Sequence, residues 1–303
     1  MRIFQVDAFT DTPFTGNPAT VILGADGRGD GVLGAIAREF PHAEVAFVLA
    51  PTGPDHDVTV RFFNARKEAP FVGHATLAAH AVLLAEGLRG LGTSRQRSGV
   101  GILAVEALER PVEGGGAGAN GPAIAFRQTV PRFDEPLPFE TTLRVAAALG
   151  MPGERLHAGW PARIARKGST RLLVPVAGAA SLEDANPNFE ALRMIGTEIG
   201  AEGFFLFAPT IEAGSAFTDS RMFCPAIGIP EDPVSGNAHG MLAAYLLRAG
   251  FLGAHRTRFV GRQGQQMHRP GRVDVDLSFE HGELTGVRIG GSAVIVSRGR
   301  LTV

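Results

Sequence analysis

The chain contains 303 residues, a length that suits two domains of ordinary size, and 45% of them are hydrophobic, enough for substantial cores. The formal net charge is −1 and the lysine and arginine residues are scattered, which argues against nucleic acid or an anionic membrane as a partner. Because the first residues do not resemble a signal peptide and no run approaches about 18 apolar residues, we expect a soluble cytoplasmic protein without a membrane span.

Short strand-like runs alternate with helical ones along the chain. Apolar and other side chains alternate with period two at 58–63, and strands are also predicted at 101–107, 123–128, 203–208, 273–279 and 293–297. Helices are predicted at 32–40, 75–86, 142–149, 189–199 and 240–247. The glycine-rich segment 114–122 is typical of a turn or linker. We therefore expect domains at 1–121 and 122–303, with the last strand free to cross to the first domain.

A weak internal repeat links the two halves of the chain. In each half an Arg-x-Phe strand is followed by an acidic residue, then by Gly, a polar residue and Ala, and then by a helix of small residues. The first copy comprises 61–63, Glu68 and 73–75, and the second comprises 221–223, 231–232 and 236–238. The repeat predicts two similarly built domains, each presenting a helix N-terminus, with a small-molecule site in the cleft that they form. Chance similarity among common residues is the alternative.

The cysteine content limits the chemistry. Cys224 is the only cysteine, so an internal disulfide is impossible and a reducing compartment is natural. Some racemases without cofactors use two thiols, one on each face of the substrate carbon. One cysteine in a chain cannot supply such a pair, and any proton transfer must therefore rest on oxygen or nitrogen bases.

Residues 231–240 contain the first candidate site. Asp232 precedes Pro233 and is therefore expected in an extended or turn segment. Ser235, Gly236 and Asn237 suit a turn that leads into a helix, and Ser235 or Asn237 can cap that helix. Free N–H groups at a helix start favour an anion such as a substrate carboxylate. A well-capped structural helix without a ligand is the alternative.

The matching part of the first half contains Gly73 and His74, followed by an apolar helix. Gly73 allows a ligand or another backbone segment to approach closely, and His74 can hold or donate a proton near neutral pH. Glu44 begins an apolar strand, where a cleft-facing carboxylate would be desolvated, would have a raised pKa and would serve as an acid/base. An exposed strand-end glutamate is the alternative. We interpret His80 as structural and His239 as a lesser candidate.

The sequence contains no recognisable cofactor or metal motif. Nine histidines are present, but neither H-E-x-x-H nor paired cysteines occur. The glycine-rich stretches match neither a dinucleotide-binding fingerprint nor a P-loop. No lysine stands in an evident Schiff-base context. We therefore expect neither a metal nor an organic cofactor.

Taken together, the chain resembles the phenazine-biosynthesis PhzF-like family, whose members are related in fold to diaminopimelate epimerase. The resemblance extends nearly from end to end, and its value lies in the order of the matching segments along the chain. These segments are 7–10, 14–19, 44–48, 61–63, 73–76, 221–223, 231–236, 263–264, 269–270 and 290–291.

The resemblance implies an α+β fold with two similar domains, each a mixed sheet rolled around a central helix, and an active site in the inter-domain cleft. It implies a reaction without a metal or an organic cofactor. The glutamate that matches Glu44 shuttles a proton between substrate carbons in this family. The residues that match His74 and Asp232 orient the substrate and handle protons, and the glycines that match Gly73 and Gly236 bring backbone N–H groups to it.

The chain departs from the family pattern in two places. Asn237 stands where relatives usually have a small hydroxyl residue, and we include it with Ser235 among the substrate-binding residues. An amide donates a hydrogen bond but does not relay a proton, so the difference concerns the substrate more than proton transfer. The segment before Gly73 lacks the usual Thr-Pro pair, and its Arg66 and Lys67 are interpreted as a solvated face.

The leading hypothesis is a cofactor-independent isomerase that moves a proton on a small carboxylate-bearing metabolite. Backbone N–H groups near Gly73 and Gly236 would stabilise the negative charge that develops. One alternative is a lyase or hydratase that uses the same glutamate to eliminate water or an amine. Another is a non-catalytic small-molecule-binding protein on the same scaffold. The resemblance also predicts a homodimer.

Overall fold

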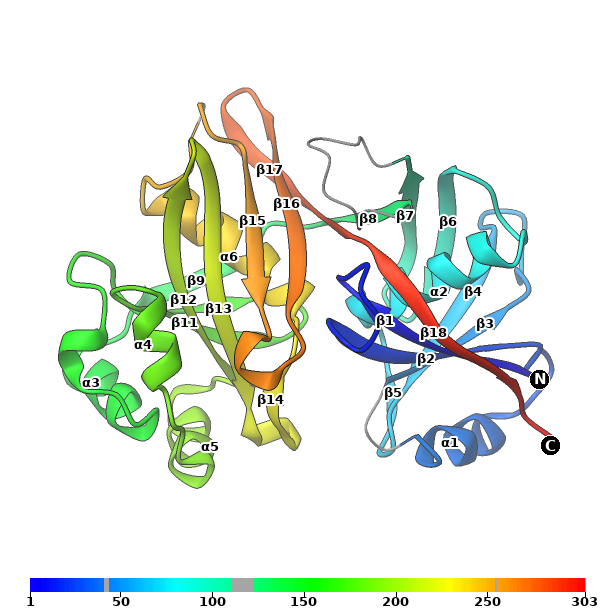
Figure 1. The fold of residues 1–303 in the computed structure, drawn as a ribbon, viewed down its shortest axis with the longest axis horizontal. Helices are drawn as coiled ribbons and strands as arrows, with labels where there is room; N and C mark the ends of the chain where they lie inside the picture. The colour runs from blue at the N-terminus through cyan, green and yellow to red at the C-terminus, as the bar shows by residue number, and fades with distance from the viewer. Residues whose placement is uncertain (41–43, 110–121, 254, 303) are drawn as a thin grey trace. The chain divides into compact units, whose positions relative to one another are not determined.

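A computed structural model describes residues 1–40, 44–109, 122–253 and 255–302 of the chain (Figure 1). The chain divides into two compact units. Unit 1 comprises Met1–Arg127 and Gly290–Val303, and unit 2 comprises Gln128–Ile289. Residues 114–121 of the predicted linker lie outside the described part of the chain. No described helix combines the length and the hydrophobicity that crossing a bilayer requires.

Unit 1 is a mixed sheet with two helices. Along the sheet the strands follow the order β18-β1-β2-β3-β4-β6-β7-β8, and the β2–β3 and β4–β6 pairs are parallel. The bounds of its elements are β1 Arg2–Ala8, β2 Asn17–Leu23, α1 Asp30–Arg38, β3 Glu44–Leu49, β4 Val58–Phe63, β5 Glu68–Ala69, α2 Gly73–Ala85, β6 Gly92–Ser98, β7 Gly101–Leu108, β8 Ala123–Gln128 and β18 Ala293–Arg300. Strand β18, red in Figure 1, returns the end of the chain to β1.

Helix α2 is the centre of unit 1 because it is apolar nearly all round. Its sequence GHATLAAHAVLLA leaves no polar stripe that could face water, which is typical of a buried helix. Ala75, Ala78 and Val82 of α2 share one core with side chains of β1, β2, β3 and β4, including Val21 and Phe62. Helix α1 covers the other face of the same strands. The sheet thus curves around α2 on one side and packs on α1 on the other.

Unit 2 repeats this construction. Its strands follow the order β9-β10-β11-β12-β13-β15-β16, and the β11–β12 and β13–β15 pairs are parallel. The bounds of its elements are β9 Arg132–Pro136, α3 Phe139–Ala148, η1 Gly153–Arg155, β10 Arg163–Arg166, β11 Thr170–Pro175, α4 Ala179–Asp184, α5 Phe189–Ile199, β12 Gly203–Glu212, β13 Ser215–Cys224, η2 Pro225–Ile227, β14 Ile229–Asp232, α6 Gly236–Arg248, β15 Arg258–Gln263, η3 Gln265–Met267, β16 Gly271–Glu280 and β17 Glu283–Gly291. Most residues of α6 are buried, as in α2.

The topologies of the two units correspond strand by strand. The run β1-β2-β3-β4-β6-β7 has the same alternation of antiparallel and parallel pairs as the run β10-β11-β12-β13-β15-β16. In both runs a short strand, β5 or β14, pairs with the fourth strand and precedes the central helix. The predicted α+β class with two similarly built halves is confirmed.

Several predicted elements coincide with the observed ones. The helix at Phe189–Ile199 and the strands at Val58–Phe63 and Ala123–Gln128 have the predicted bounds. The two central helices begin earlier than predicted, at Gly73 and Gly236. The prediction rests on an apolar pattern that starts only after residues 73–74 in α2 and after residues 236–239, mostly glycine and polar residues, in α6, so it places the first turn too late.

Candidate functional site

Glu44 opens strand β3, which is parallel to β2 and starts at the same edge of the sheet. Side chains two residues apart in a strand share a face, so Glu44 points to the same side as Ala46. Ala46 belongs to the core that Ala75 and Ala78 of α2 complete. Glu44 therefore lies on the face of the sheet that α2 covers, half-buried, with its Oε2 atom shielded from solvent.

The N-terminus of α2 presents backbone donors without a side-chain cap. Val72 occupies the N-cap position and its aliphatic side chain accepts no hydrogen bond, so the first N–H groups of the helix are left for other acceptors. A Cβ atom on Gly73 would lie 3.3 Å from Cζ of Phe126, which leaves little room for a side chain. Burial lowers the pKa of His74 to about 4, so its imidazole is neutral at pH 7 although part of it reaches solvent.

The loop that joins β1 to β2 is strained and lies at the edge where β3 begins. Phe9 and Phe14 have positive φ angles of 63° and 68°, a conformation that large side chains rarely adopt. The carboxylate of Asp7 accepts the N–H of Phe14 at 2.7 Å and stabilises this arrangement. Phe14 nevertheless exposes 71% of its surface. Strain of this kind is concentrated at functional sites, and the loop was not among the residues predicted from the sequence.

In unit 2, Asp232 ends β14 and is held from behind by Gln263. The Gln263 amide donates to the carbonyl of Asp232 at 2.6 Å, and its oxygen accepts the N–H of Ser235 at 3.0 Å. Only glycine fits at the next position, Gly264, because a Cβ atom there would lie 2.2 Å from the carbonyl oxygen of Arg269. The Gln263-Gly264 pair thus fixes the backbone that carries Asp232 into helix α6, a positioning role that spacing in the sequence does not reveal.

The start of α6 is formed by the three residues that the sequence predicts as a turn leading into it. Ser235 is its N-cap, and the serine hydroxyl accepts the N–H of Ala238 at 3.3 Å. Gly236 is buried at the first helical position. Asn237 follows, and its Nδ2 atom donates to the hydroxyl of Ser169 at 2.7 Å. The asparagine is therefore bonded to the turn between β10 and β11, which brings a hydroxyl group to this end of α6.

Corresponding arginines brace both central helices. Arg61 makes a two-pronged ion pair with Glu68 at 2.8 and 2.7 Å, and Arg221 does the same with Glu231 at 2.9 Å for both contacts. Each guanidinium also lies over the phenylalanine two residues further along its strand, 5.1 and 4.8 Å from the ring centre. The acidic residues of the predicted repeat are thus partners of the arginines, and they fix the short strand that leads into each helix.

The position of Glu44 has a counterpart in unit 2 that lacks a side chain. Val45 pairs with Phe63 in unit 1, and Phe204 pairs with Phe223 at the corresponding place in unit 2. Glu44 precedes Val45 and Gly203 precedes Phe204, so these two residues occupy matching positions. A Cβ atom on Gly203 would lie 2.6 Å from Sγ of Cys224, so this site is closed to a larger residue.

The remaining candidates also differ between the two copies. Asp232 pairs with Met222, as Ala69 pairs with Phe62, so the aspartate corresponds to an alanine in unit 1. His74 and Asn237 are the second residues of α2 and α6. Unit 1 therefore carries Glu44 at the start of β3 and His74 in the first turn of α2, and unit 2 carries Asp232 at the end of β14 and Asn237 in the first turn of α6.

Three other reactive side chains are structural. His80 is buried and bonds Gln96 at 3.0 Å, and burial lowers its pKa to about 4. His239, the lesser candidate, is fully buried, and its Nδ1 bonds the carbonyl of Ser235 at 2.8 Å, so it supports the helix cap. Burial raises the pKa of the Cys224 thiol to about 12, which keeps it protonated. Within the described ranges, no group of three or more His, Cys, Asp or Glu residues is placed to hold a metal ion.

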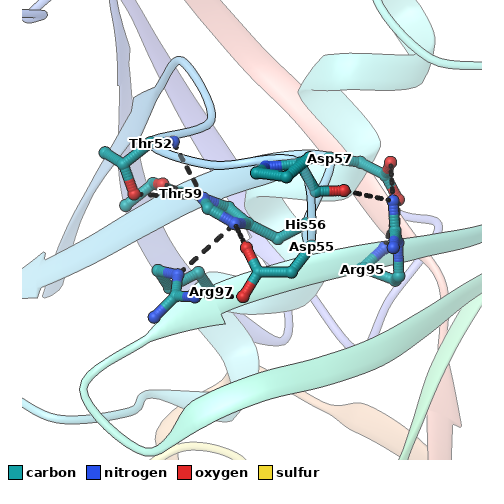
Figure 2. A network of polar contacts seen from close by, with 8 residues as sticks. Thr52, Asp55, His56, Asp57, Thr59, Arg95 and Arg97 are labelled. Carbon is teal, nitrogen blue, oxygen red and sulfur yellow. Dashed lines mark hydrogen bonds and ion pairs between the residues drawn. The ribbon is translucent and has the colours of Figure 1, made fainter.

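A second polar cluster lies in the loop between β3 and β4 (Figure 2). Nδ1 of His56 lies 2.6 Å from Oδ1 of Asp55, and Nε2 lies 3.0 Å from the hydroxyl of Thr59. This order resembles a nucleophile activated by histidine. However, Nε2 already accepts the backbone N–H of Thr52 at 2.9 Å, so it is not available as a base for the threonine. The cluster braces the loop and is not a second catalytic centre.

Comparison with known proteins gives one consistent family. The family model for PhzC-PhzF, phenazine biosynthesis-like protein, matches residues 6–299. An isomerase named YddE from Salmonella typhimurium is 37% identical over 97% of this chain and 96% of its own length. A trans-2,3-dihydro-3-hydroxyanthranilate isomerase from Pseudomonas aeruginosa is 28% identical over 99% of this chain and 98% of its own.

Solved structures agree with the sequence comparison. A PhzF-family phenazine biosynthesis protein from Bacillus anthracis superposes with a TM-score of 0.87 and 27% identity, over 100% of this chain and 99% of that one. A hydroxyproline epimerase from Agrobacterium vitis has a TM-score of 0.63 with 12% identity over 99% of this chain and 91% of that one, a likeness of fold alone.

Proposed function

Because the chain belongs to the phenazine biosynthesis-like protein family, we propose that it is a cofactor-independent isomerase in which Glu44 moves a proton on a small carboxylate-bearing metabolite. The observation that carries this assignment is the place of Glu44. It stands half-buried at the start of β3, on the face covered by α2, with one oxygen shielded from solvent. Partial desolvation of a carboxylate makes it a stronger base and a usable acid.

The reaction begins when the Glu44 carboxylate removes a proton from a carbon next to an activating group. The electron pair moves into the activating group, where negative charge develops. The N–H groups of the uncapped first turn of α2, beginning at Gly73, are suited to stabilise that charge. The carboxylic acid of Glu44 then returns the proton to another carbon, so that the glutamate ends in its original state and no atoms are gained or lost.

His74 and Asp232 are proposed as assisting residues. With a pKa lowered to about 4, His74 is neutral at pH 7 and acts through hydrogen bonds that orient the substrate. The family resemblance assigns Asp232 and Gly236 to substrate binding, and we propose Ser235 and Asn237 as further substrate-binding residues. Gln263 holds the Asp232 backbone in place, which supports a positioned carboxylate rather than a mobile one.

The first substrate to test is trans-2,3-dihydro-3-hydroxyanthranilate, the compound in the name of the Pseudomonas aeruginosa relative. Relatives usually have a small hydroxyl residue at the position of Asn237, and here the larger amide is bonded to Ser169. We therefore expect this chain to act on a related carboxylate of different shape. Elimination of water or an amine by the same glutamate is the alternative reaction. Products formed in deuterated water separate the two, because isomerisation incorporates the label without loss of a leaving group.

The substitution Glu44→Gln tests the assignment. The amide cannot accept and return the proton, so turnover should fall by about 10²–10⁴-fold while the melting temperature and the substrate affinity stay near the wild-type values. Glu39→Gln, at an exposed acid in the same unit, is the matched control and should keep wild-type turnover. Full turnover by Glu44→Gln would show that another group is the base. A non-catalytic binding protein would be favoured if the wild-type protein showed no turnover and Glu44→Gln bound the ligand as tightly as the wild type.

A further inference from the structure

The turn between β10 and β11 carries one of only two lysines in the chain. Lys167, Gly168 and Ser169 form this turn, which is closed by a hydrogen bond of 3.0 Å from the Lys167 N–H to the Ser169 carbonyl. Gly168 has a φ angle of +67°, the left-handed conformation that a tight turn requires. The short loop and its hydrogen bond give the two flanking side chains defined positions.

This turn packs against the first two turns of α6. The Ser169 hydroxyl accepts the Asn237 amide at 2.7 Å, and the Lys167 ammonium donates to Oε1 of Gln128. The same Gln128 oxygen covers Gly240, where a Cβ atom would lie 2.2 Å from it. Asn237 and Gly240 are three residues apart and so share one flank of the helix. Lys167 and Ser169 therefore lie together along the flank of α6 next to its N-terminus.

The charge of Lys167 is not matched by a carboxylate. A cavity of about 280 Å³ is lined by Arg166, Lys167, Gly168, Ser169, Thr170 and Glu202. Arg166 is paired with Asp134 at 2.7 Å, and Glu202 is paired with Arg171 at 3.3 Å. Lys167 makes no ion pair with any residue of the described ranges, and the group that it contacts is a neutral amide. Among the described residues, the cavity thus contains an ammonium group with no carboxylate at ion-pair distance.

We propose that the Lys167–Ser169 turn is an anion subsite in which Lys167 binds a carboxylate of the substrate and so determines which substrates are accepted. The inference rests on the proposed function, since it takes the substrate to be a carboxylate. Ser169 adds a hydroxyl donor, because its oxygen accepts from Asn237 and its proton remains available. The pocket is open to solvent, and its volume of about 280 Å³ gives room for a small carboxylate.

The subsite makes carboxylate binding depend on pH. Burial lowers the pKa of Lys167 to about 7, and a bound carboxylate favours the ammonium form and raises this pKa again. Binding above pH 7 therefore takes up a proton, and affinity should fall by up to about tenfold per pH unit until the pKa of the complex is reached. The other charged groups that line the cavity are Arg166, which is paired with Asp134, and Glu202, which is paired with Arg171. His239 of α6, with a pKa near 4, is neutral throughout this range.

The scarcity of lysine makes a direct test possible. With Lys67 as the only other lysine, protein labelled with carbon-13 at lysine Cε gives two side-chain signals, which the Lys67→Met variant assigns. The Lys167 signal should titrate near pH 7 in the free protein and at least about one pH unit higher with saturating benzoate or succinate. Lys167→Met should weaken binding of these probes at pH 7 by about tenfold or more and abolish its pH dependence. Lys67→Met, at an exposed residue, should behave like the wild-type protein.

Several results would overturn the subsite. These are a Lys167 signal whose titration is unchanged by the probes, probe binding unaffected by Lys167→Met, or a wild-type protein that binds neither probe. The proposed function is tested separately through Glu44. If Glu44→Gln keeps full turnover while Lys167 still responds to the probes, the subsite stands and the base assignment fails. If Glu44→Gln abolishes turnover while Lys167 does not respond, the reverse holds.

Discussion

Burial moves the pKa of two ionisable side chains further from neutral pH in this protein. The same physical cause, loss of hydration of the charged form, lowers the pKa of His74 to about 4 and raises that of Cys224 to about 12. His74 is therefore a neutral hydrogen-bonding group and Cys224 an unreactive thiol. Glu44 keeps part of its side chain in contact with solvent and is not sealed in the core.

Cys224 offers a direct check that thiol chemistry plays no part. Because the thiol is buried and stays protonated, iodoacetamide at pH 8 should leave the native protein unmodified and fully active. Intact-mass spectrometry should show a single adduct only after the protein is unfolded in urea. Rapid modification of the native protein with parallel loss of turnover would contradict this and would reopen a thiol mechanism.

Each central helix is positioned by an arginine that holds the preceding short strand. The two braces share their geometry but differ in surroundings. The side chains of Arg221 and Glu231 are 9% and 15% exposed, against 25% and 43% for Arg61 and Glu68. Arg221 also donates to two backbone carbonyls of the α4 region, at 2.9 and 2.7 Å. The brace of α6 is thus a buried network, and that of α2 is closer to a surface ion pair.

This difference predicts unequal costs for the same substitution. Arg221→Met leaves Glu231 and two carbonyls buried without their donor and should lower the free energy of unfolding by about 3–5 kcal/mol. Arg61→Met removes two solvated ion pairs, to Glu68 and to Asp30, and should cost about 1 kcal/mol or less. Urea unfolding of both variants measures the two values. Equal losses would mean that the environment of the pair does not decide its contribution.

Over the whole molecule, two copies of one topology have taken different residues at matching positions. Glu44 corresponds to Gly203, and Asp232 corresponds to Ala69. A symmetric pair of bases, one from each copy, is therefore absent from these positions. This asymmetry supports the proposal that one glutamate both removes and returns the proton.

A single shielded base predicts partial retention of a label. A substrate deuterated at the carbon that loses its proton, turned over in ordinary water, should yield a product that keeps part of its deuterium at the new position. The reason is that Oε2 of Glu44 is shielded from solvent, which slows exchange before the proton is returned. Mass spectrometry of the product after partial conversion measures the retained fraction. Complete loss of the label at every stage would contradict a single shielded base.

The repeat, the two central helices and Glu44 as the opening residue of a strand follow from local patterns in the sequence. Arg-x-Phe followed by an acid and a Gly-polar-Ala helix start was enough to predict two similar halves, because each signal lies within about twenty residues of chain. The family resemblance added the order of motifs and, with it, the assignment of Glu44, His74 and Asp232. The roles of these residues remain predictions.

The support of Asp232 by Gln263, the contact of Asn237 with Ser169, and the cavity at Lys167 were decided only by the tertiary structure. Each joins residues that lie 31 to 68 positions apart in the chain, and no periodic pattern encodes such a pairing. The same holds for the pKa values of His74 and Lys167, since burial is a property of packing. The sequence by itself determined the architecture and the candidate base, whereas folding determined which neutral and charged groups surround them.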